Sequence, residues 1–221
     1  ESNDFTTVLL DEDCNCLAEN SGGIPSFVGV VPSTVKAMFE YIPIKEWRPG
    51  DCLITNDPWF GSGHLPDITM ASPIFYREKL VGFSGSIAHL PDIGGVGWAS
   101  DGRELYEEGL RIMPVKFLEE GKENKIVGQF IRSNVRVSDQ VIGDIYAQVA
   151  AQRICQNGLI QFLEDTGLPD LTELSTALRS RAEAAMREAI SALPDGSWMS
   201  SLDADGVDER ETHIDCRVTI K

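Results

Sequence analysis

Histidine is scarce in this 221-residue chain, and two of its three histidines lie in a tetrad that occurs twice. The segment His-Leu-Pro-Asp stands at residues 64–67 and again at residues 89–92. Imidazole nitrogens and a carboxylate form a mixed ligand set that suits Mn, Fe, Zn or Co. We therefore predict one metal ion on His64, Asp67 and His89, with room for water or substrate as a fourth ligand.

Asp92 ends the second tetrad and has two interpretations. It is either a fourth metal ligand or an acceptor that fixes the tautomer of an imidazole. The competing view of both tetrads is that each histidine is a hydrogen-bonded core residue. The shared H-x-x-D context and the neighbouring glycine-rich turns favour the metal site.

Three further charged residues lie in motifs near the tetrads. Asp57, in the turn segment "NDPW", and Glu108 are the predicted general bases. Arg111 either binds an anionic group of the substrate or belongs to a solvated loop. The sequence contains neither G-x-x-x-x-G-K-[ST] nor G-x-G-x-x-G, so any nucleotide is expected to bind elsewhere.

These residues need strands and loops to position them, and the first half of the chain is rich in strand patterns. β-Branched and aromatic runs predict strands, and "REK" at 77–79 predicts the turn of a hairpin that ends at His89. One helix is expected at 32–42, with Ser33 as its N-cap and Pro43 after its end. The predicted strands are 5–10, 51–55, 67–76 and 79–89.

The second half has helical patterns at 138–167 and 171–193. Ser138 or Asp139 is the expected cap of the first of these helices, and Gly167 its stop. The fold class is therefore predicted as α+β, with a β-rich N-terminal half containing hairpins and a helical layer from the second half. The expected regions are a metal-site region (1–130), a helical region (131–200) and the start of a further β region (201–221).

Composition limits the possible functions. Thirty-five acidic residues against 19 basic ones give a net charge of −16, which argues against nucleic acid as a partner. The chain has no run of 18 apolar residues, so no membrane span is predicted. Five cysteines, an odd number without a C-x-x-C motif, indicate free thiols and a cytoplasmic location. The alternating strand pattern at the end of the chain, residues 213–220, suggests that it is part of a longer polypeptide.

Several stretches together resemble the hydantoinase B / 5-oxoprolinase family. The most specific are "NDP" followed by G-x-x-H-x-x-D (56–67) and "EGLRIMPVK" (108–116). The stretches together extend over nearly the whole chain, in the order typical of the family. The chain resembles the N-terminal portion of the longer family members. The full set of stretches is 4–13, 31–40, 48–75, 80–95, 104–116, 134–153 and 193–198, and the two specific motifs lie within 48–75 and 104–116.

The resemblance implies a metal-bearing subunit that works with an A-type partner, which binds ATP and Mg. The partner phosphorylates a carbonyl of the substrate, and the pair opens a cyclic amide such as a hydantoin, 5-oxoproline or a lactam. In related ketone carboxylases an activated enol is carboxylated instead. Their ligand motif, two histidines and an aspartate, carries over onto His64, Asp67 and His89, with Mn, Zn or Fe as the expected metal. A non-catalytic assembly subunit remains an alternative from another class.

Two positions depart from the family pattern. Phe27 and Leu90 stand where many members carry histidine. If both line the site, the pocket is more apolar than usual and favours a hydrophobic ketone or lactam. The alternative is that both residues only pack in the core.

Overall fold

The computed structural model describes residues 4–27, 29–97, 102–206 and 211–221. Its chain separates into two compact units, residues 1–175 and 176–221. The strands are β1 (Phe5–Leu10), β2 (Cys16–Glu19), β3 (Cys52–Thr55), β4 (Asp67–Tyr76), β5 (Lys79–His89), β6 (Val115–Glu119), β7 (Lys122–Glu123), β8 (Gly196–Ala204) and β9 (Thr212–Ile220). The helices are α1 (Val30–Tyr41), α2 (Leu105–Glu108), α3 (Lys125–Asn134), α4 (Ser138–Thr166) and α5 (Thr172–Ser191), with short 3-10 turns at Pro25–Phe27 and Ile44–Glu46.

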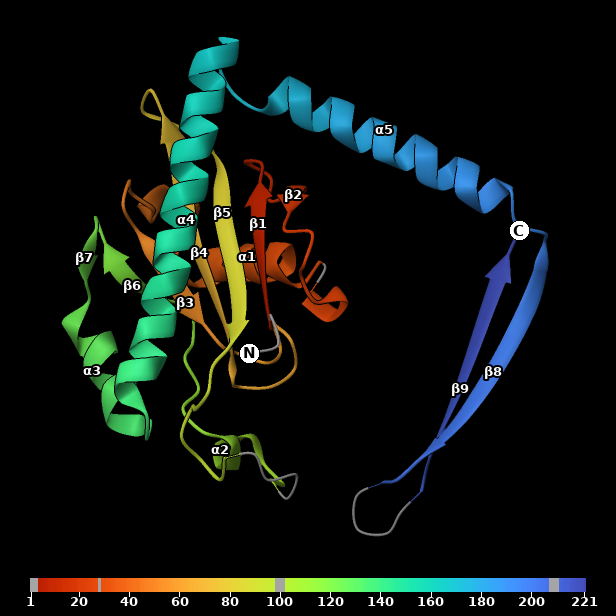
Figure 1. Cartoon of the computed structure of the whole chain (residues 1–221), viewed down its shortest axis with the longest axis horizontal. Helices are drawn as coiled ribbons and strands as arrows, with labels where there is room; N and C mark the ends of the chain where they lie inside the picture. Colours follow the sequence, from red (N-terminus) through yellow and green to blue (C-terminus); the bar gives the residue numbers. More distant parts are fainter. Residues whose placement is uncertain (1–3, 28, 98–101, 207–210) are drawn as a thin grey trace. The chain divides into compact units, whose positions relative to one another are not determined.

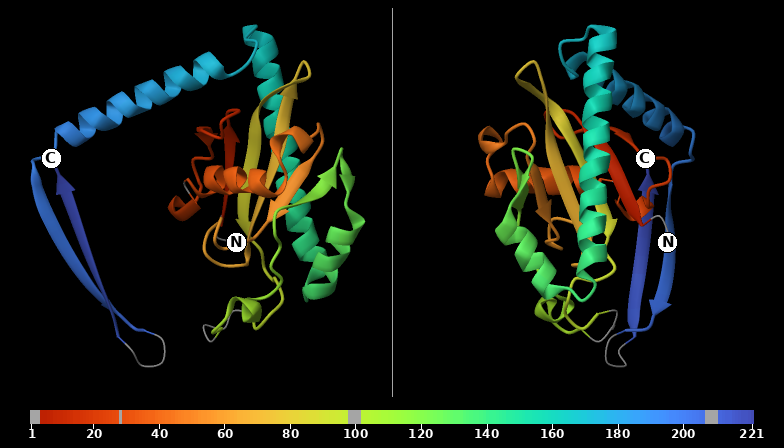
Figure 2. Two further views of the ribbon diagram at one scale, coloured as in Figure 1. Left: turned by 180° about the vertical axis from the view of Figure 1, so that it is seen from behind. Right: turned by 60° about the vertical axis from the view of Figure 1, so that its left-hand side comes forward.

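The first unit is built on a seven-stranded antiparallel sheet in the order β2-β1-β5-β4-β3-β6-β7. Helix α4 crosses one face of this sheet, and α1 lies on the other (Figures 1 and 2). The predicted α+β class is confirmed, as is the helical layer that α4 supplies. The predicted hairpin is also confirmed, because β4 and β5 are joined by a two-residue turn at Arg77 and Glu78.

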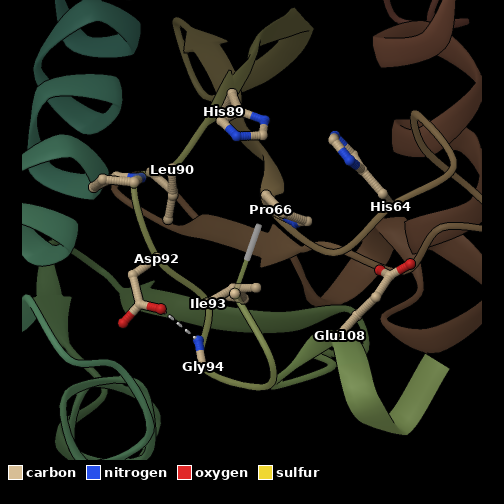
Figure 3. Close-up of a pocket in the computed structure, with 10 residues that line it drawn as sticks. His64, Pro66, His89, Leu90, Asp92, Ile93, Gly94 and Glu108 are labelled. Carbon is tan, nitrogen blue, oxygen red and sulfur yellow. Dashed lines mark hydrogen bonds between the residues drawn. The ribbon is translucent and has the colours of Figure 1, made fainter. Parts of the chain in front are cut away.

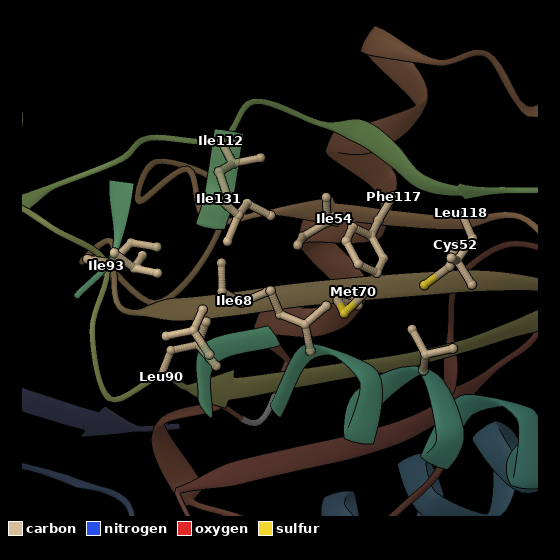
Figure 4. Packing of buried hydrophobic residues seen from close by; sticks show 14 of the residues in the cluster. Cys52, Ile54, Ile68, Met70, Leu90, Ile93, Ile112, Phe117, Leu118 and Ile131 are labelled. Carbon is tan, nitrogen blue, oxygen red and sulfur yellow. The ribbon is translucent and has the colours of Figure 1, made fainter. Parts of the chain in front are cut away.

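Alternation along the strands divides the core between the two faces of the sheet. Cys52 and Ile54 of β3 face one cluster, whereas Leu53, between them, faces the other. The first cluster packs beneath α4 (Figure 4) and the second beneath α1. Because both faces are covered, β4 is buried along nearly its whole length, and Asp67, Thr69 and Ser72 are its only polar residues.

Close packing of α1 on the sheet depends on Gly85 in β5. A Cβ atom there would lie 2.6 Å from Val31 Cγ1 and 3.2 Å from Val8 Cγ2. The glycine therefore lets the first turn of α1 approach the strand, which fixes the sheet between its two helical layers.

The N-caps predicted for two helices were wrong. Gly29, not Ser33, is the N-cap of α1, and the Ser33 hydroxyl instead donates to the carbonyl oxygens of Gly29 and Val30. Val137 precedes α4 without a side-chain cap, so neither Ser138 nor Asp139 has that role. Gly167 does end α4, in the left-handed conformation that favours glycine.

The second unit contains most of α5 and a two-stranded antiparallel sheet of β8 and β9. Apolar side chains of this hairpin, such as Met199 and Ile214, are exposed. Within the described residues, none of the helices combines the length and apolar character that crossing a membrane requires.

Candidate metal centre

The hairpin of β4 and β5 places two of the predicted ligands side by side. Asp67 is the first residue of β4, His89 is the last residue of β5, and the two are directly paired in the ladder. Residues that pair across antiparallel strands project from the same face, so the carboxylate and the imidazole meet. His89 Nδ1 lies 2.8 Å from Asp67 Oδ1.

The loop before β4 supplies His64. Its Nε2 atom lies 2.8 Å from Asp67 Oδ2, and the two imidazole rings are 5.2 Å apart between centroids. One ligand atom from each of His64, Asp67 and His89 lies within 4.8 Å of the others. The structure thus brings together the three residues proposed from the sequence as metal ligands.

The electrostatics of the cluster keep Asp67 ionised. Burial raises the pKa of this carboxyl group, but the hydrogen bond from His89 and the nearby His64 outweigh burial and lower it. The pKa of His89 is raised, chiefly by its hydrogen bond to Asp67 and against the effect of burial. The Asp67 side chain is only 3% exposed, and such a buried carboxylate needs cationic partners or a metal ion.

A cavity of about 250 Å³ opens beside the two histidines (Figure 3). Much of its wall is apolar, and Glu108 contributes a carboxylate on the side of His64. Glu108 Oε2 accepts a hydrogen bond of 2.9 Å from the backbone N–H of Leu65, which ties α2 to the His64 loop. The apolar residues of the wall are Pro66, Leu90, Pro91 and Ile93.

The two tetrads differ in the position of their aspartates. Asp67 of the first is a candidate ligand, whereas Asp92 of the second lies away from the candidate ligands. The Asp92 carboxylate accepts hydrogen bonds from the backbone N–H groups of Gly94 and Arg136, and Arg136 Nη1 lies 2.8 Å from its Oδ1. Burial raises the pKa of Asp92, but these donors together lower it. Asp92 therefore fixes the 92–95 loop in the wall of the cavity.

Asp57 and Arg111 form an ion pair with each other, and the Asp57 side chain is fully buried. The Arg111 Nε–H group donates to Asp57 Oδ2 at 2.7 Å. The Asp57 carboxylate also accepts from the backbone N–H of Trp59. This pair joins the start of the His64 loop to the segment that follows α2, so both residues support the walls of the site.

Asn56 is a site-supporting residue that sequence reasoning missed. Its side-chain amide donates to the carbonyl oxygens of Leu65 and Leu110, and its Oδ1 atom accepts from the backbone N–H of Ile112. It therefore ties the His64 loop to residues 110–112, which follow α2. Its place directly before the Asp-Pro turn was the available signal.

Phe27 and Leu90 have different surroundings. Leu90 lines the cavity, whereas Phe27 packs in the core cluster beneath α1. Of these two residues, only Leu90 therefore contributes to the apolar wall beside the histidines.

A family model described as hydantoinase B/oxoprolinase matches residues 1–221 of the chain. The chain belongs to this family. The beta subunit of the Pseudomonas jessenii caprolactamase is 29% identical over 225 residues, which include 100% of this chain and 38% of that subunit. The crystal structure of the ATP-dependent caprolactamase from the same organism superimposes with a TM-score of 0.92 at 28% identity, again over 100% of this chain and 38% of that one.

Two further relatives carry the names of different activities. 5-Oxoprolinase 1 of Arabidopsis thaliana is 32% identical over 205 residues, covering 84% of this chain and 16% of the relative. The acetophenone carboxylase delta subunit of Aromatoleum aromaticum is 26% identical over 181 residues, covering 80% of this chain and 26% of that subunit. The chain thus spans less than two fifths of the length of these relatives.

Gly95 is expected to be essential for the position of Glu108. Its φ is +59°, and a Cβ atom there would lie 2.3 Å from both the Glu107 carbonyl oxygen and the Glu108 carbonyl carbon. Gly95→Ala should therefore displace α2 and lower the free energy of unfolding by more than about 1 kcal/mol. Urea denaturation measures this change. Gly97→Ala is the matched control, because φ there is also positive (+75°) but no atom of the residues that the structure describes lies within 4 Å of the added Cβ. Equal stabilities of the two variants would contradict the proposed contact.

Proposed function

We propose that this chain is the metal-bearing part of an ATP-dependent enzyme that opens a cyclic amide of the hydantoin, 5-oxoproline or lactam type. The observation that carries the proposal is the convergence of His64, Asp67 and His89 beside a cavity of substrate size. Two imidazoles and one buried carboxylate fit a divalent Mn, Zn or Fe ion. When bound, such an ion supplies Lewis acidity and lowers the pKa of water.

The remaining residues have supporting roles in this proposal. Glu108 is the carboxylate of the cavity wall that lies on the side of His64, and in this proposal it accepts or returns a proton of the substrate or of water. Asp92 and Asp57 hold the two loops that frame the cavity, and Arg111 positions Asp57. The apolar wall around Leu90 limits the access of water to an activated substrate.

ATP and Mg belong, in this proposal, to an A-type partner subunit that phosphorylates the substrate carbonyl. The names of the relatives as beta and delta subunits support the existence of partner subunits. Trp59 of the His64 loop and Tyr106 of α2 are 82% and 85% exposed, on the two segments that frame the cavity. Exposed aromatic side chains of this kind are typical of protein interfaces, and they support a partner that docks near the site.

Carboxylation of a ketone through an activated enol is the second candidate. The similarity to the acetophenone carboxylase delta subunit favours it, as does the apolar cavity wall, because the activated enol must be kept from water. A non-catalytic assembly role is the third candidate, and it predicts no site-bound metal. Metal analysis of the purified native complex, followed by ATP-dependent assays with cyclic amides and with ketones plus bicarbonate, distinguishes the three.

Glu108→Gln tests the proposed proton transfer. The amide oxygen can still accept from the Leu65 N–H group, so metal content and stability should be unchanged. Loss of the acid–base group should lower kcat by about 10²–10⁴-fold in the assembled complex. Glu107→Gln, at the exposed neighbouring position, is the control and should retain normal turnover. A Glu108→Gln variant with normal kcat would remove Glu108 from the chemistry.

A further inference from the structure

The β8–β9 hairpin of the second unit has one apolar face and one mostly polar face. Direct pairing across the ladder places Trp198 beside Val218 and Leu202 beside Ile214. These four side chains share a face, because residues paired across antiparallel strands, and residues two apart along a strand, project to the same side. Their exposed fractions range from 46% to 62%. The described residues therefore leave this apolar face largely uncovered.

Strand β9 is also an open edge. Among the described residues its sheet contains only β8 and β9, and eight of the nine residues of β9 are exposed. The ladder of β9 with β8 runs from Thr212 to Ile220 without a register shift. A sheet of two strands is marginally stable in water, and a regular edge strand offers its outward backbone N–H and C=O groups to another strand. Strand β9 is therefore suited to pair with a third strand.

The sequence of β9 is complementary to itself when two copies run antiparallel with Cys216 opposite Cys216. Asp215 of each copy then lies opposite Arg217 of the other, which gives two pairs of opposite charge. Ile214 lies opposite Val218 in the same register, so apolar side chains also meet apolar side chains. Both kinds of contact stabilise an antiparallel pair of strands.

Neighbouring registers lack this match. Pairing centred on Asp215 would set two carboxylates opposite each other, and pairing centred on Arg217 would set two guanidinium groups opposite each other. A shift of one residue would join the apolar face of one copy to the polar face of the other. The charges and the alternation of β9 therefore favour the register centred on Cys216.

We propose that β9 pairs with β9 of a second copy of this chain, antiparallel and centred on Cys216. The product is a four-stranded sheet in the order β8-β9-β9-β8, in which two-fold symmetry repeats every contact. Three or more strands with an apolar face suffice for a stable sheet, so the pairing stabilises a hairpin that is marginal alone. This inference does not depend on the proposed function.

Cys216 provides a direct test of the register. Directly opposed residues of antiparallel strands have Cα atoms about 4.5–5.5 Å apart, which is within the span of a disulfide bond. Copper–phenanthroline in air should oxidise the two thiols to a disulfide in the purified 221-residue protein, with oxygen taking up the electrons. The cross-linked dimer is detected on a non-reducing gel, and the linked peptide by mass spectrometry. Cys216→Ser should abolish the cross-link, whereas Cys16→Ser, which removes the other exposed thiol, should not.

Charge swaps test the same pairing through the dissociation constant of the dimer, measured by sedimentation velocity over a concentration series. Asp215→Arg and Arg217→Asp should each raise this constant about tenfold or more, because like charges then face each other twice. The double swap restores opposite charges and should restore both the affinity and the cross-link. Asp215→Arg reduces the net charge of −16 by two units, so general repulsion between the chains would predict tighter association instead.

Asp203→Arg is the matched control for the charge swaps. It makes the same change of charge on the same face of the hairpin, but on β8 and away from the β9 edge. Its dimer should therefore dissociate with the constant of the unmodified protein.

Several results would overturn the inference. A protein that is monomeric throughout the concentration series does not pair through β9. A dimer that survives both single swaps, or that cross-links through Cys16 and not Cys216, is held together by another surface. A monomer in which the β9 amides exchange slowly with deuterium would show that another segment of the polypeptide covers the edge, and this too would refute pairing with a second copy.

Discussion

If the proposed function holds, His64→Ala and His89→Ala should each remove the proposed divalent metal and abolish the proposed ATP-dependent turnover. Each substitution removes one of three ligands whose donor atoms lie within 4.8 Å of one another. The remaining imidazole and the Asp67 carboxylate would hold a transition-metal ion far more weakly. Elemental analysis of the purified variants, as metal ions per chain, measures the first effect, and product formation in the assembled complex measures the second.

The third histidine provides a matched control for this experiment. His213 in β9 is exposed and contacts two carboxylates, with 2.5 Å from its Nδ1 atom to Asp203 Oδ1 and 3.2 Å from its Nε2 atom to Asp215 Oδ1. His213→Ala should leave metal content and turnover unchanged. Equal metal content in all three variants, with circular dichroism showing intact folding, would refute the metal centre.

The positions of the strands that build the site were predictable from local sequence. The runs at 67–76 and 79–89 are rich in β-branched and apolar residues, and the structure has strands with these bounds. The ends of a hairpin lie close together, which is why Asp67 and His89 could be grouped before the structure was known. His64 follows because it is only three residues before Asp67.

The register of β4 against β5, which brings His89 opposite Asp67, was not predictable from the sequence. At the turn Tyr76 pairs with Lys79 and Phe75 with Leu80, so paired residue numbers add to 155, which would place Ala88 opposite Asp67. A bulge between Ile74 and Phe75 raises the sum to 156, and His89 then pairs with Asp67. Without the extra residue His89 would project from the opposite face of the sheet.

The long-range ion pairs could not be predicted from the sequence either. Asp92 is held by Arg136, 44 residues away, and Asp57 is held by Arg111, 54 residues away. Neither pair leaves a local pattern, because each depends on how loops pack after the sheet has formed. The two identical tetrads therefore contribute unequally to the candidate metal centre: the first supplies two of the candidate ligands and the second supplies one.

Ile145→Asp in α4 is expected to lower the free energy of unfolding by about 4 kcal/mol or more. Ile145 is fully buried in the core cluster between α4 and the sheet. The substitution removes buried methyl groups, which alone costs about 2–5 kcal/mol for truncation to alanine, and it introduces a carboxylate without a partner. The same cluster contains Leu65 and Leu90, each next to a histidine of the candidate metal centre, so metal content should fall together with stability.

Ile154→Asp is the matched control, because it makes the same chemical change on the same helix at a position that is 73% exposed. Surface substitutions usually change stability by less than about 0.5 kcal/mol, so this variant should unfold at nearly the urea concentration of the unmodified protein. If Ile145→Asp were equally stable, α4 could not be the layer that covers this face of the sheet. If only Ile154→Asp were destabilised, the exposed face of α4 would be covered by another part of the full-length protein. More of the helix would then be buried than the contacts within residues 1–175 account for.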